Sequence, residues 1–301
     1  MTGLGALVRR NTKLYFKDKG MFFTSLITPL ILLVLYSTFL GNVYEDSFRS
    51  ALEAAGAAVS DELIWGCVGG QLVSSLLAVS CVTVAFCSNL LMVQDKTTGS
   101  RQDLTIAPIQ KSTLSLSYYL STLCSTMLIS LAATAVCLGY LSMVGWFLTA
   151  EDVAALVLDV VLLVMFGTAL SSCVIFPLST NGQASAVGTI ISAGYGFICG
   201  AYMPISSFSE GLQKAISFLP GSYGTSLLRN HALRGVFEEM GNQGFPPAVV
   251  EAIRDSVDCN LYFFEKKVEL SHMYLVMIAS VLFFIGLYIA MTVLSQRKHR
   301  R

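Results

Sequence analysis

The chain has 301 residues, of which 54% are hydrophobic and only 13% are charged, and its formal net charge is zero. Soluble globular proteins carry about 25% charged residues. This composition, with a mean hydropathy of +0.67, therefore excludes an ordinary soluble domain and indicates an integral membrane protein.

Residues 1–19 have the pattern of an amphipathic helix. At about 100° per residue, the apolar and basic side chains fall on opposite arcs. The apolar arc contains Leu4, Leu7, Val8, Leu14 and Tyr15, and the basic arc contains Arg9, Arg10, Lys13 and Lys17. Such a helix lies along a membrane surface. The basic start of a signal peptide fits less well, because the apolar run that follows is long and lacks a convincing cleavage site.

Six apolar stretches are candidates to cross a bilayer, which takes about 20 residues in a helix. They are residues 21–40, about 64–93, about 116–146, 153–178, 184–200 and 273–294. The fifth is marginal in length and rich in glycine. We therefore predict an all-α membrane protein, a single transmembrane domain over residues 1–301 with six spans, the N-terminal interfacial helix, and short outer helices before the last span.

Charge predicts the orientation of these spans, because basic residues favour the cytoplasmic side. Basic residues concentrate in the N-terminal helix, in the segment between the second and third spans, and in the tail that ends with Arg297, Lys298, Arg300 and Arg301. The segments after the first and third spans are acidic and contain Glu45, Asp46, Glu53, Asp61, Glu62, Glu151 and Asp152, with Arg49 as the one basic residue. Both termini are therefore expected in the cytoplasm, as an even number of spans requires. We expect a multi-pass protein of the cell membrane, of the bacterial plasma-membrane type.

The second span begins with small residues, among them Gly66, Gly70 and Ser74. Small residues let membrane helices approach closely. We interpret them as packing positions in preference to direct contacts with a substrate.

The polar segment 94–115 separates the second and third spans and reads as a cytoplasmic elbow. Lys96, Arg101 and Lys111 give it a positive charge, and Leu104, Ile106 and Ile109 are apolar residues that could pack against a partner. Gly99 and Pro108 bracket a piece that has room for only two or three helical turns. A short, partly apolar element on the inner face is a docking surface.

The same elbow carries a resemblance to a family. Asp95-Lys96, Gly99-Ser100 and Leu104-Thr105-Ile106-Ala107-Pro108-Ile109 resemble the motif of ABC-2-type transporter permeases, although Asp95 and Ser100 replace the usual Glu and Thr, and Thr105 stands where a second Leu is common. The resemblance implies that this elbow is a coupling helix that rests in a groove of a separate ATPase subunit. It implies coupling roles for Asp95, Lys96, Gly99, Arg101, Leu104, Ile106, Pro108 and Ile109, and a contact of the N-terminal helix with the same ATPase.

Asp159 is the one ionisable residue that we place within a span, about 9 Å from the outer end of the fourth helix. A carboxylate at that depth is a functional candidate by default. The equally weighted alternative is a structural bond to a neighbouring hydroxyl or to an arginine of the outer segment.

The fifth span repeats small residues every four positions: Ala184, Gly188, Ser192, Gly196 and Gly200. Such a seam indicates a second backbone packed against it, from this subunit or from another one. The family resemblance implies that the second and fifth spans line the substrate path.

Residues 201–272 form the outer segment. Ser207 and Glu210 have the spacing of a capping box, and the short helix that follows ends at Pro220 and Gly221. The run Gly200-x-x-Met203-Pro204-Ile205, followed by Leu219-Pro220, resembles the re-entrant outer helices of the same permeases. Residues 227–271 read as an outer insert, with a helix at 247–257.

Seven of the eight cysteines lie in apolar runs, where they act as small hydrophobes. Cys259 is placed in an outer loop, and a disulfide to Cys67 or Cys199 is a less favoured option. The sequence has no GxxxxGK[ST] loop and no GxSxG motif, and its three histidines lack the spacing of a metal site. We therefore expect no catalytic residues, no metal and no cofactor in this chain, with ATP and Mg bound by a partner ATPase.

The sequence as a whole predicts the permease subunit of an ATP-driven exporter of a lipophilic or lipid-linked substrate. Its expected partners are ABC ATPase subunits, a second copy or homologue, and membrane lipid, with no nucleic acid. One alternative is a six-helix membrane enzyme or sensor subunit, which would have to use Asp159. Another is a secondary transporter, which would need coupling-ion carboxylates and an internal repeat that the sequence lacks.

Overall fold

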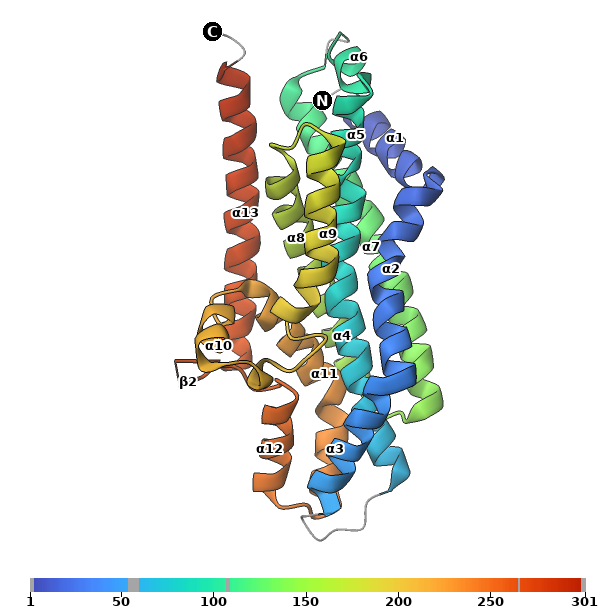
Figure 1. Ribbon diagram of the computed structural model, residues 1–301, viewed down its shortest axis with the longest axis vertical. Coiled ribbons are helices and arrows are strands. Elements are labelled where there is room, and N and C mark those ends of the chain that lie inside the picture. The colour runs from blue at the N-terminus through green and yellow to red at the C-terminus, as the bar shows by residue number, and fades with distance from the viewer. Residues whose placement is uncertain (1–2, 54–59, 107–108, 265, 299–301) are drawn as a thin grey trace.

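The computed structural model describes residues 3–53, 60–106, 109–264 and 266–298. Its elements, in chain order, are α1 (Leu4–Lys17), α2 (Lys19–Leu35), a π-helix (Tyr36–Leu40), α3 (Gly41–Glu53), α4 (Asp61–Asn89), α5 (Leu91–Thr97), α6 (Ser100–Ile106), α7 (Lys111–Val144), α8 (Ala150–Ile175), α9 (Asn181–Ile198), a 3-10 helix (Ile205–Ser207), α10 (Glu210–Ile216), α11 (Pro220–Asn242), α12 (Pro247–Ser256), β1 (Tyr262–Phe263), β2 (Lys266–Lys267) and α13 (Leu270–Lys298). The two short strands pair antiparallel, and Tyr262 lies opposite Lys267. The long helices form one elongated bundle (Figure 1).

Within the described residues, five helices are long and apolar enough to cross a membrane. They cover Lys19–Ser50, Asp61–Thr97, Lys111–Val144, Ala150–Ile175 and Leu270–Ser295. The prediction of an all-α, multi-pass membrane protein is confirmed. The expected fifth span corresponds to α9, which has 18 residues, is about 27 Å long and is not among the five, so a sixth crossing stays a prediction.

Helix α4 forms the centre of the bundle. Between Leu63 and Asn89 only Trp65 and Leu76 are partly exposed, because α2, α7, α8, α9 and α11 pack around it. A Cβ atom at Gly70 would lie 2.5 Å from the side chain of Leu233 in α11. The second span thus offers no open face for a substrate path in the described chain, contrary to the expectation from the family resemblance.

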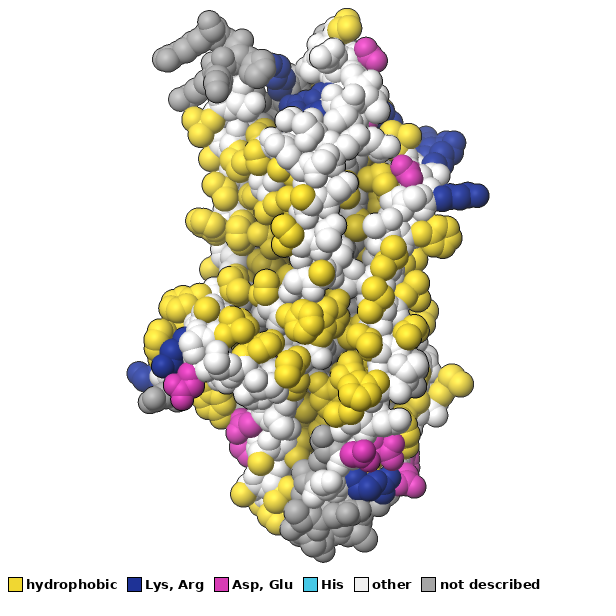
Figure 2. Space-filling model, viewed as in Figure 1, with side chains coloured by type: hydrophobic (Ala, Val, Ile, Leu, Met, Phe, Trp, Pro, Cys, Tyr) yellow, Lys and Arg dark blue, Asp and Glu magenta, His cyan; other side chains and the backbone are white. Residues whose placement is uncertain are grey.

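The surface of the bundle separates apolar from charged residues. Figure 2 shows hydrophobic side chains over the middle of one face, and charged side chains mostly in its upper and lower thirds. Exposed apolar residues such as Phe23, Ile27, Leu282 and Phe283 come from α2 and α13. This distribution is that of helices whose outer faces contact lipid.

Helix α11 is the main departure from the predicted fold. Residues 227–242 were assigned to an outer insert, but they continue a helix that begins at Pro220 and packs against α4, α8 and α13. Of the expected insert, only α12, the hairpin and their connections lie outside that helix, and α12 matches the helix predicted at 247–257. The capping box was wrong: Ser207 lies in the 3-10 helix, and the N-cap of α10 is Ser209, which makes no side-chain capping bond.

A buried ion pair joins α11 to the outer motif. The Arg229 guanidinium lies 3.0 Å from Asp258 Oδ2, also donates to Ser75 Oγ at 3.3 Å and to the Gly200 carbonyl, and is 1% exposed. Asp258 Oδ2 also accepts a bond from the Ile205 backbone N–H at 2.7 Å. A buried pair of this kind fixes the geometry of the groups around it, because breaking it leaves an uncompensated charge.

The prolines of the outer motif lie at helix starts. Pro204 precedes the 3-10 helix, and Pro220 is the first residue of α11, where a missing N–H is tolerated. Cys259 is buried and not in an open loop, and all eight cysteines, which fall within the described ranges, are free thiols. The disulfide option is therefore not supported.

Candidate functional site

The elbow is built from α5 and α6, which continue α4 beyond its end and form the upper tip of the bundle in Figure 1. Gly99 lies between the two short helices with a φ of +82°, a left-handed conformation that glycine adopts without strain. The chain can therefore reverse sharply here, and α6 projects from the end of the bundle.

Asp95 is buried within this elbow and does not lie on its surface. Arg10 of α1 binds it through two hydrogen bonds, Nη1 to Oδ2 at 2.7 Å and Nη2 to Oδ1 at 3.0 Å. Tyr118 of α7 donates its hydroxyl to Oδ2 at 2.6 Å, and the Asp95 side chain is 5% exposed. The hydrogen bonds with Asp95 raise the pKa of Arg10 above its ordinary value. This cluster joins α1, α5 and α7.

Lys96 makes a second internal attachment. Its Nζ donates to the backbone carbonyls of Phe176 and Leu178, both at 2.6 Å. Phe176 is the C-cap residue of α8, where a cation is favoured by unpaired carbonyls and by the helix dipole. Asp95 and Lys96 were expected on the docking surface, but they connect the elbow to three other helices of the same chain.

The exposed part of the elbow is the tip of α6. Ile106 is 84% exposed, whereas Leu104 and Ile109 pack partly against the hydrophobic core, so two of the three apolar residues expected to dock are directed inward. Arg101 is half-buried. Pro108 lies outside the described residues. The exposed apolar surface of the elbow is therefore smaller than predicted and is centred on Ile106.

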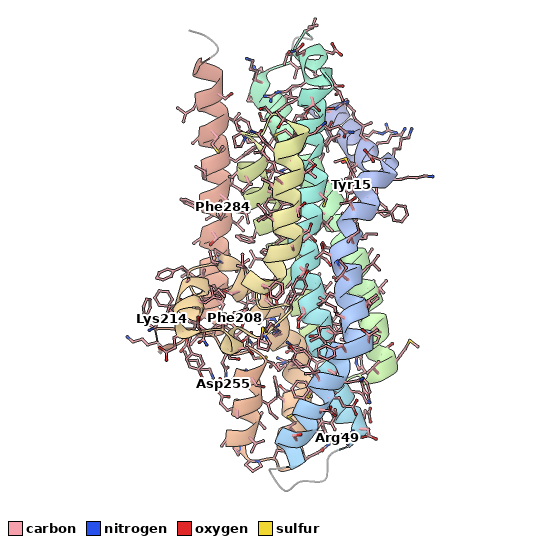
Figure 3. All side chains as sticks on the ribbon, viewed as in Figure 1. Tyr15, Arg49, Phe208, Lys214, Asp255 and Phe284 are labelled. Atoms are coloured by element: carbon pink, nitrogen blue, oxygen red, sulfur yellow. The ribbon has the colours of Figure 1, made fainter. Side chains whose placement is uncertain are left out.

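Most basic residues of α1 are exposed, but one is bonded inside the elbow. Arg9, Lys13 and Lys17 are exposed, whereas Arg10 is held by Asp95. The buried stripe of α1 is Leu7, Asn11 and Tyr15, and Leu14, which was assigned to the apolar arc, is 37% exposed. Figure 3 labels Tyr15, whose hydroxyl donates to Ser25 Oγ of α2 at 2.8 Å. Helix α1 is thus fixed to the bundle along one side and open along the other.

Asp159 has two partners from other helices. The Nδ1 atom of His231 in α11 lies 2.6 Å from Oδ2, and the hydroxyl of Tyr274 in α13 donates to Oδ1 at 2.6 Å. Both carboxylate oxygens are therefore in hydrogen bonds. The Tyr274 hydroxyl is the kind of partner that the structural alternative named, whereas a histidine stands in place of the arginine that it also allowed. Sequence reasoning missed His231 because it treated that histidine as isolated in an outer insert.

The glycine seam of α9 contacts the rest of the chain at the end of the helix that is remote from the elbow. A Cβ atom at Gly196 would collide with the ring of Tyr202, and Gly200 has a φ of +75° and lies against Ile205. At Gly188 such an atom would meet nothing within 4 Å. The Ser192 carbonyl accepts a long bond of 3.5 Å from the Tyr202 hydroxyl. The backbone expected against the whole seam is thus not provided by the described part of this chain.

A family model described as ABC-2 type transporter matches residues 2–232. This chain belongs to the ABC-2 type transporter family. The match covers more than three quarters of the chain and includes α1, the elbow, α9 and the outer motif around Pro204. It ends within α11, so α12, the hairpin and α13 lie beyond it.

Members of the ABC-2 family are the membrane permeases of ABC transporters and work with ABC ATPase subunits. The ABC-2 permease described here is accordingly a transport subunit of the membrane. The comparison with curated proteins found none that matches this chain.

Proposed function

We propose that this ABC-2 permease is the transmembrane subunit of an exporter that moves a lipophilic or lipid-linked substrate out of the cell, driven by a separate ATPase. ATP and Mg would be bound by that partner. The observation that carries the proposal is the elbow: an exposed tip, centred on Ile106, whose base is fixed to the bundle by the partly buried hydrogen bonds of Asp95 and Lys96. A contact made at the tip acts on a rigid base.

The bonds at the base specify what such a contact would move. Asp95 connects the elbow to α1 and α7, and Lys96 connects it to the end of α8. Because α5 continues α4 with only Leu90 between them, a displacement of α6 would be transmitted to the central helix as well. The helices would then tilt together as a rigid body when the ATPase closes on ATP.

A second copy or a homologous permease would complete the transporter. The open positions of α9, Gly188 above all, are available to such a partner, and α4 has no face left for it in the described chain. The substrate path would then run between the two subunits, with α9 on its wall. The elbow and both termini would lie in the cytoplasm, and the permease in the cell membrane.

The enzyme or sensor alternative has less support. It would depend on Asp159, but both carboxylate oxygens of this residue are engaged by His231 and Tyr274. Those bonds join α8, α11 and α13, which is the arrangement of a structural link between helices.

Substitution at the tip tests the proposal. Ile106→Asp should reduce the affinity for the ATPase roughly tenfold or more, because burial of an isoleucine side chain in an interface contributes about 1.5–3 kcal/mol. Copurification of the two chains and substrate-stimulated ATPase activity are the measurements. Leu104→Pro, which interrupts α6, should abolish the stimulation while the protein stays in the membrane.

Met143→Asp is the matched control, since Met143 is 87% exposed and lies at the end of α7 opposite to the elbow. It should leave the ATPase affinity unchanged. Normal coupling in both Ile106→Asp and Leu104→Pro would refute the role of the elbow.

A further inference from the structure

A cavity of about 650 Å³ lies between α3, residues 202–207 and α12. Its walls include the aromatic residues Tyr44, Phe48 and Tyr202 and the aliphatic residues Val43 and Val249, and none of the described side chains that line it carries a charge. Ligand pockets in proteins have volumes of about 300–1,000 Å³ and mostly apolar walls. The size and lining of this cavity fit one small molecule.

The aromatic wall is ordered by stacking. The rings of Tyr36 and Tyr44 are stacked with centroids 5.6 Å apart, and those of Tyr44 and Phe48 with centroids 6.2 Å apart. Phe48 is 3% exposed and Tyr44 9% exposed. These side chains are therefore held in place by their neighbours before any ligand arrives, which lowers the entropic cost of binding.

A π-helix forms the edge of the same wall. It covers Tyr36–Leu40, and Leu40 lines the cavity. A Cβ atom at Gly41 would lie 2.5 Å from the Tyr36 carbonyl oxygen, so the irregular turn depends on a glycine at that position. Single π-turns cost helical regularity and occur frequently at functional sites. The π-helix is an observation separate from the cavity volume, and it lies at the edge of the same cavity.

The cavity lies at the end of the bundle remote from the elbow. Helices α3 and α12 are at the lower end of Figure 1, and Figure 3 labels Arg49 on α3 and Asp255 on α12 at that end. Arg49 pairs with Glu45 and Asp61, at 3.0 and 2.9 Å. The charge of Arg49, the cation on α3, is thus already balanced by two carboxylates of the same chain.

We propose that this outer cavity binds one uncharged, lipophilic molecule with an elongated apolar part. A charged group placed against these walls would lose its hydration without gaining an opposite charge, whereas an alkyl or polyprenyl chain would bury its surface against the aromatic and aliphatic side chains. The Ser207 hydroxyl, also on the wall, can donate a hydrogen bond to an alcohol or ester, and the Ser256 hydroxyl, which itself donates to the Ile253 carbonyl, can accept one from an alcohol. That the bound molecule is the exported substrate on its way out rests on the proposed function; the binding itself does not.

Photolabelling of the full chain in lipid nanodiscs tests the binding. The probes are a C16 alcohol and a diacyl phospholipid, each with a diazirine in its alkyl chain, and the labelled positions are located by mass spectrometry. We expect the alcohol to label α3, residues 202–207 and α12. Labelling by the alcohol alone would support an uncharged lipophile as the ligand, whereas equal labelling by the phospholipid would show that the cavity takes up bilayer acyl chains without distinction and would overturn the proposal.

Two substitutions fill the cavity from opposite walls: Val43→Trp on α3 and Ala252→Trp on α12. Each should reduce the cavity labelling roughly tenfold, because the new ring would exclude the ligand from part of the cavity. The loss of about two buried methylene groups of the ligand corresponds to a tenfold lower affinity. Asn42→Trp is the matched control, because Asn42 is exposed on the same helix and does not line the cavity. The labelling of a variant counts only if its elution profile and unfolding midpoint match those of the wild-type chain. Two variants on opposite walls are used so that the test does not depend on the folding of a single one.

Cavity labelling that is absent, or that persists at the wild-type level in folded Val43→Trp and Ala252→Trp, would overturn the proposal. The proposed transport function has a separate readout. If ATPase coupling is intact while the cavity is unlabelled, only the cavity assignment fails; if the cavity is labelled but no ATPase couples to the elbow, only the transport proposal fails.

Discussion

At the scale of single residues, Asp95 and Asp159 each link three of the long or elbow helices. Asp95 accepts hydrogen bonds from Arg10 and Tyr118, and Asp159 contacts His231 and Tyr274. In each case the partners come from two other helices. A buried carboxylate has several acceptor positions, and in a site with little water those positions have to be filled by protein donors.

Removal of the Asp95 charge should release α1 from the elbow. Asp95→Asn keeps the side-chain volume but loses the ionic bidentate bond, and charge-assisted bonds of this kind contribute about 1.5–3 kcal/mol. Because the Arg10 side chain is 31% exposed, solvent reduces that value, and we expect a loss of about 1–2 kcal/mol. The measurement is the denaturation midpoint of the purified chain, together with proteolysis after Arg10.

The control for this experiment is Arg9→Ala, because Arg9 is exposed on the same helix. This variant should keep a free energy of unfolding within about 0.5 kcal/mol of the wild-type value. Its rate of proteolysis after Arg10 should also match that of the wild-type chain. The Arg10→Ala and Asp95→Asn double variant should be no less stable than the worse of the single variants, since the two residues share one interaction. Additive losses would show that the pair is not coupled.

Tyr274→Phe tests the link between α8 and α13. The substitution removes the hydroxyl that Asp159 accepts at 2.6 Å, and hydrogen bonds between membrane helices contribute about 0.6–2 kcal/mol. We expect a destabilisation in that range and no further loss when Asp159→Ala is already present. Tyr140→Phe in α7 is the matched control, and an equal effect of the two phenylalanine variants would contradict the assigned role.

At the scale of elements, hydropathy was sufficient to predict the long apolar helices but not α11. Helices α2, α4, α7, α8 and α13 are recognisable because apolar residues continue for the thickness of a bilayer. Helix α11 contains Arg229, Asn230, His231 and Arg234, which have the composition of an exposed helix. Arg229 and His231 are held inside the bundle by Asp258 and Asp159, residues distant in the sequence, and no local pattern identifies such partners.

The elbow shows the same limit for the candidate site. Its position, its short helices and the turn at Gly99 were predictable from glycine, charge and the flanking apolar runs. Which residues of the elbow are exposed and which bond to other helices of the chain was not predictable. Asp95 and Lys96 are adjacent to the exposed tip in sequence, but their partners in α1 and α8 are about 80 positions away.

For the π-helix between α2 and α3, we predict that replacing a glycine by alanine lowers the stability of the chain, the opposite of the usual effect in a helix. Gly→Ala in a helix interior ordinarily stabilises it by up to about 1 kcal/mol. At Gly41 the new Cβ would lie 2.5 Å from the Tyr36 carbonyl oxygen, so Gly41→Ala should instead destabilise the chain by about 1–3 kcal/mol. Gly139→Ala in α7, where nothing lies within 4 Å, should be neutral or stabilising; the midpoints of urea unfolding compare the two.

At the scale of the whole molecule, the direction of each helix constrains the number of crossings. Helix α8 ends beside the elbow, where Lys96 bonds the carbonyls of Phe176 and Leu178 just after the helix, and Tyr274 in the first turns of α13 lies beside Asp159 in the first half of α8. The chain must therefore return from the elbow end of the bundle to the opposite end between α8 and α13. Helix α9 follows that course in Figure 1, alongside α4, although it is not among the five helices that are long and apolar enough to count as candidate spans.

Cysteine accessibility decides whether α9 is the sixth crossing. In a cysteine-free background, Asn181→Cys at the start of α9 and Thr105→Cys in the elbow should react with a membrane-impermeant maleimide only from the cytoplasmic side. Lys214→Cys in α10, which follows α9, should react only from outside; Asn181, Thr105 and Lys214 are exposed or partly exposed in the structure. The physical reason is that 18 helical residues extend about 27 Å, close to the thickness of the hydrocarbon layer. Reaction of positions 181 and 214 from the same side would show that α9 does not cross, and reaction of position 105 from outside would place the elbow beyond the reach of any cytoplasmic ATPase.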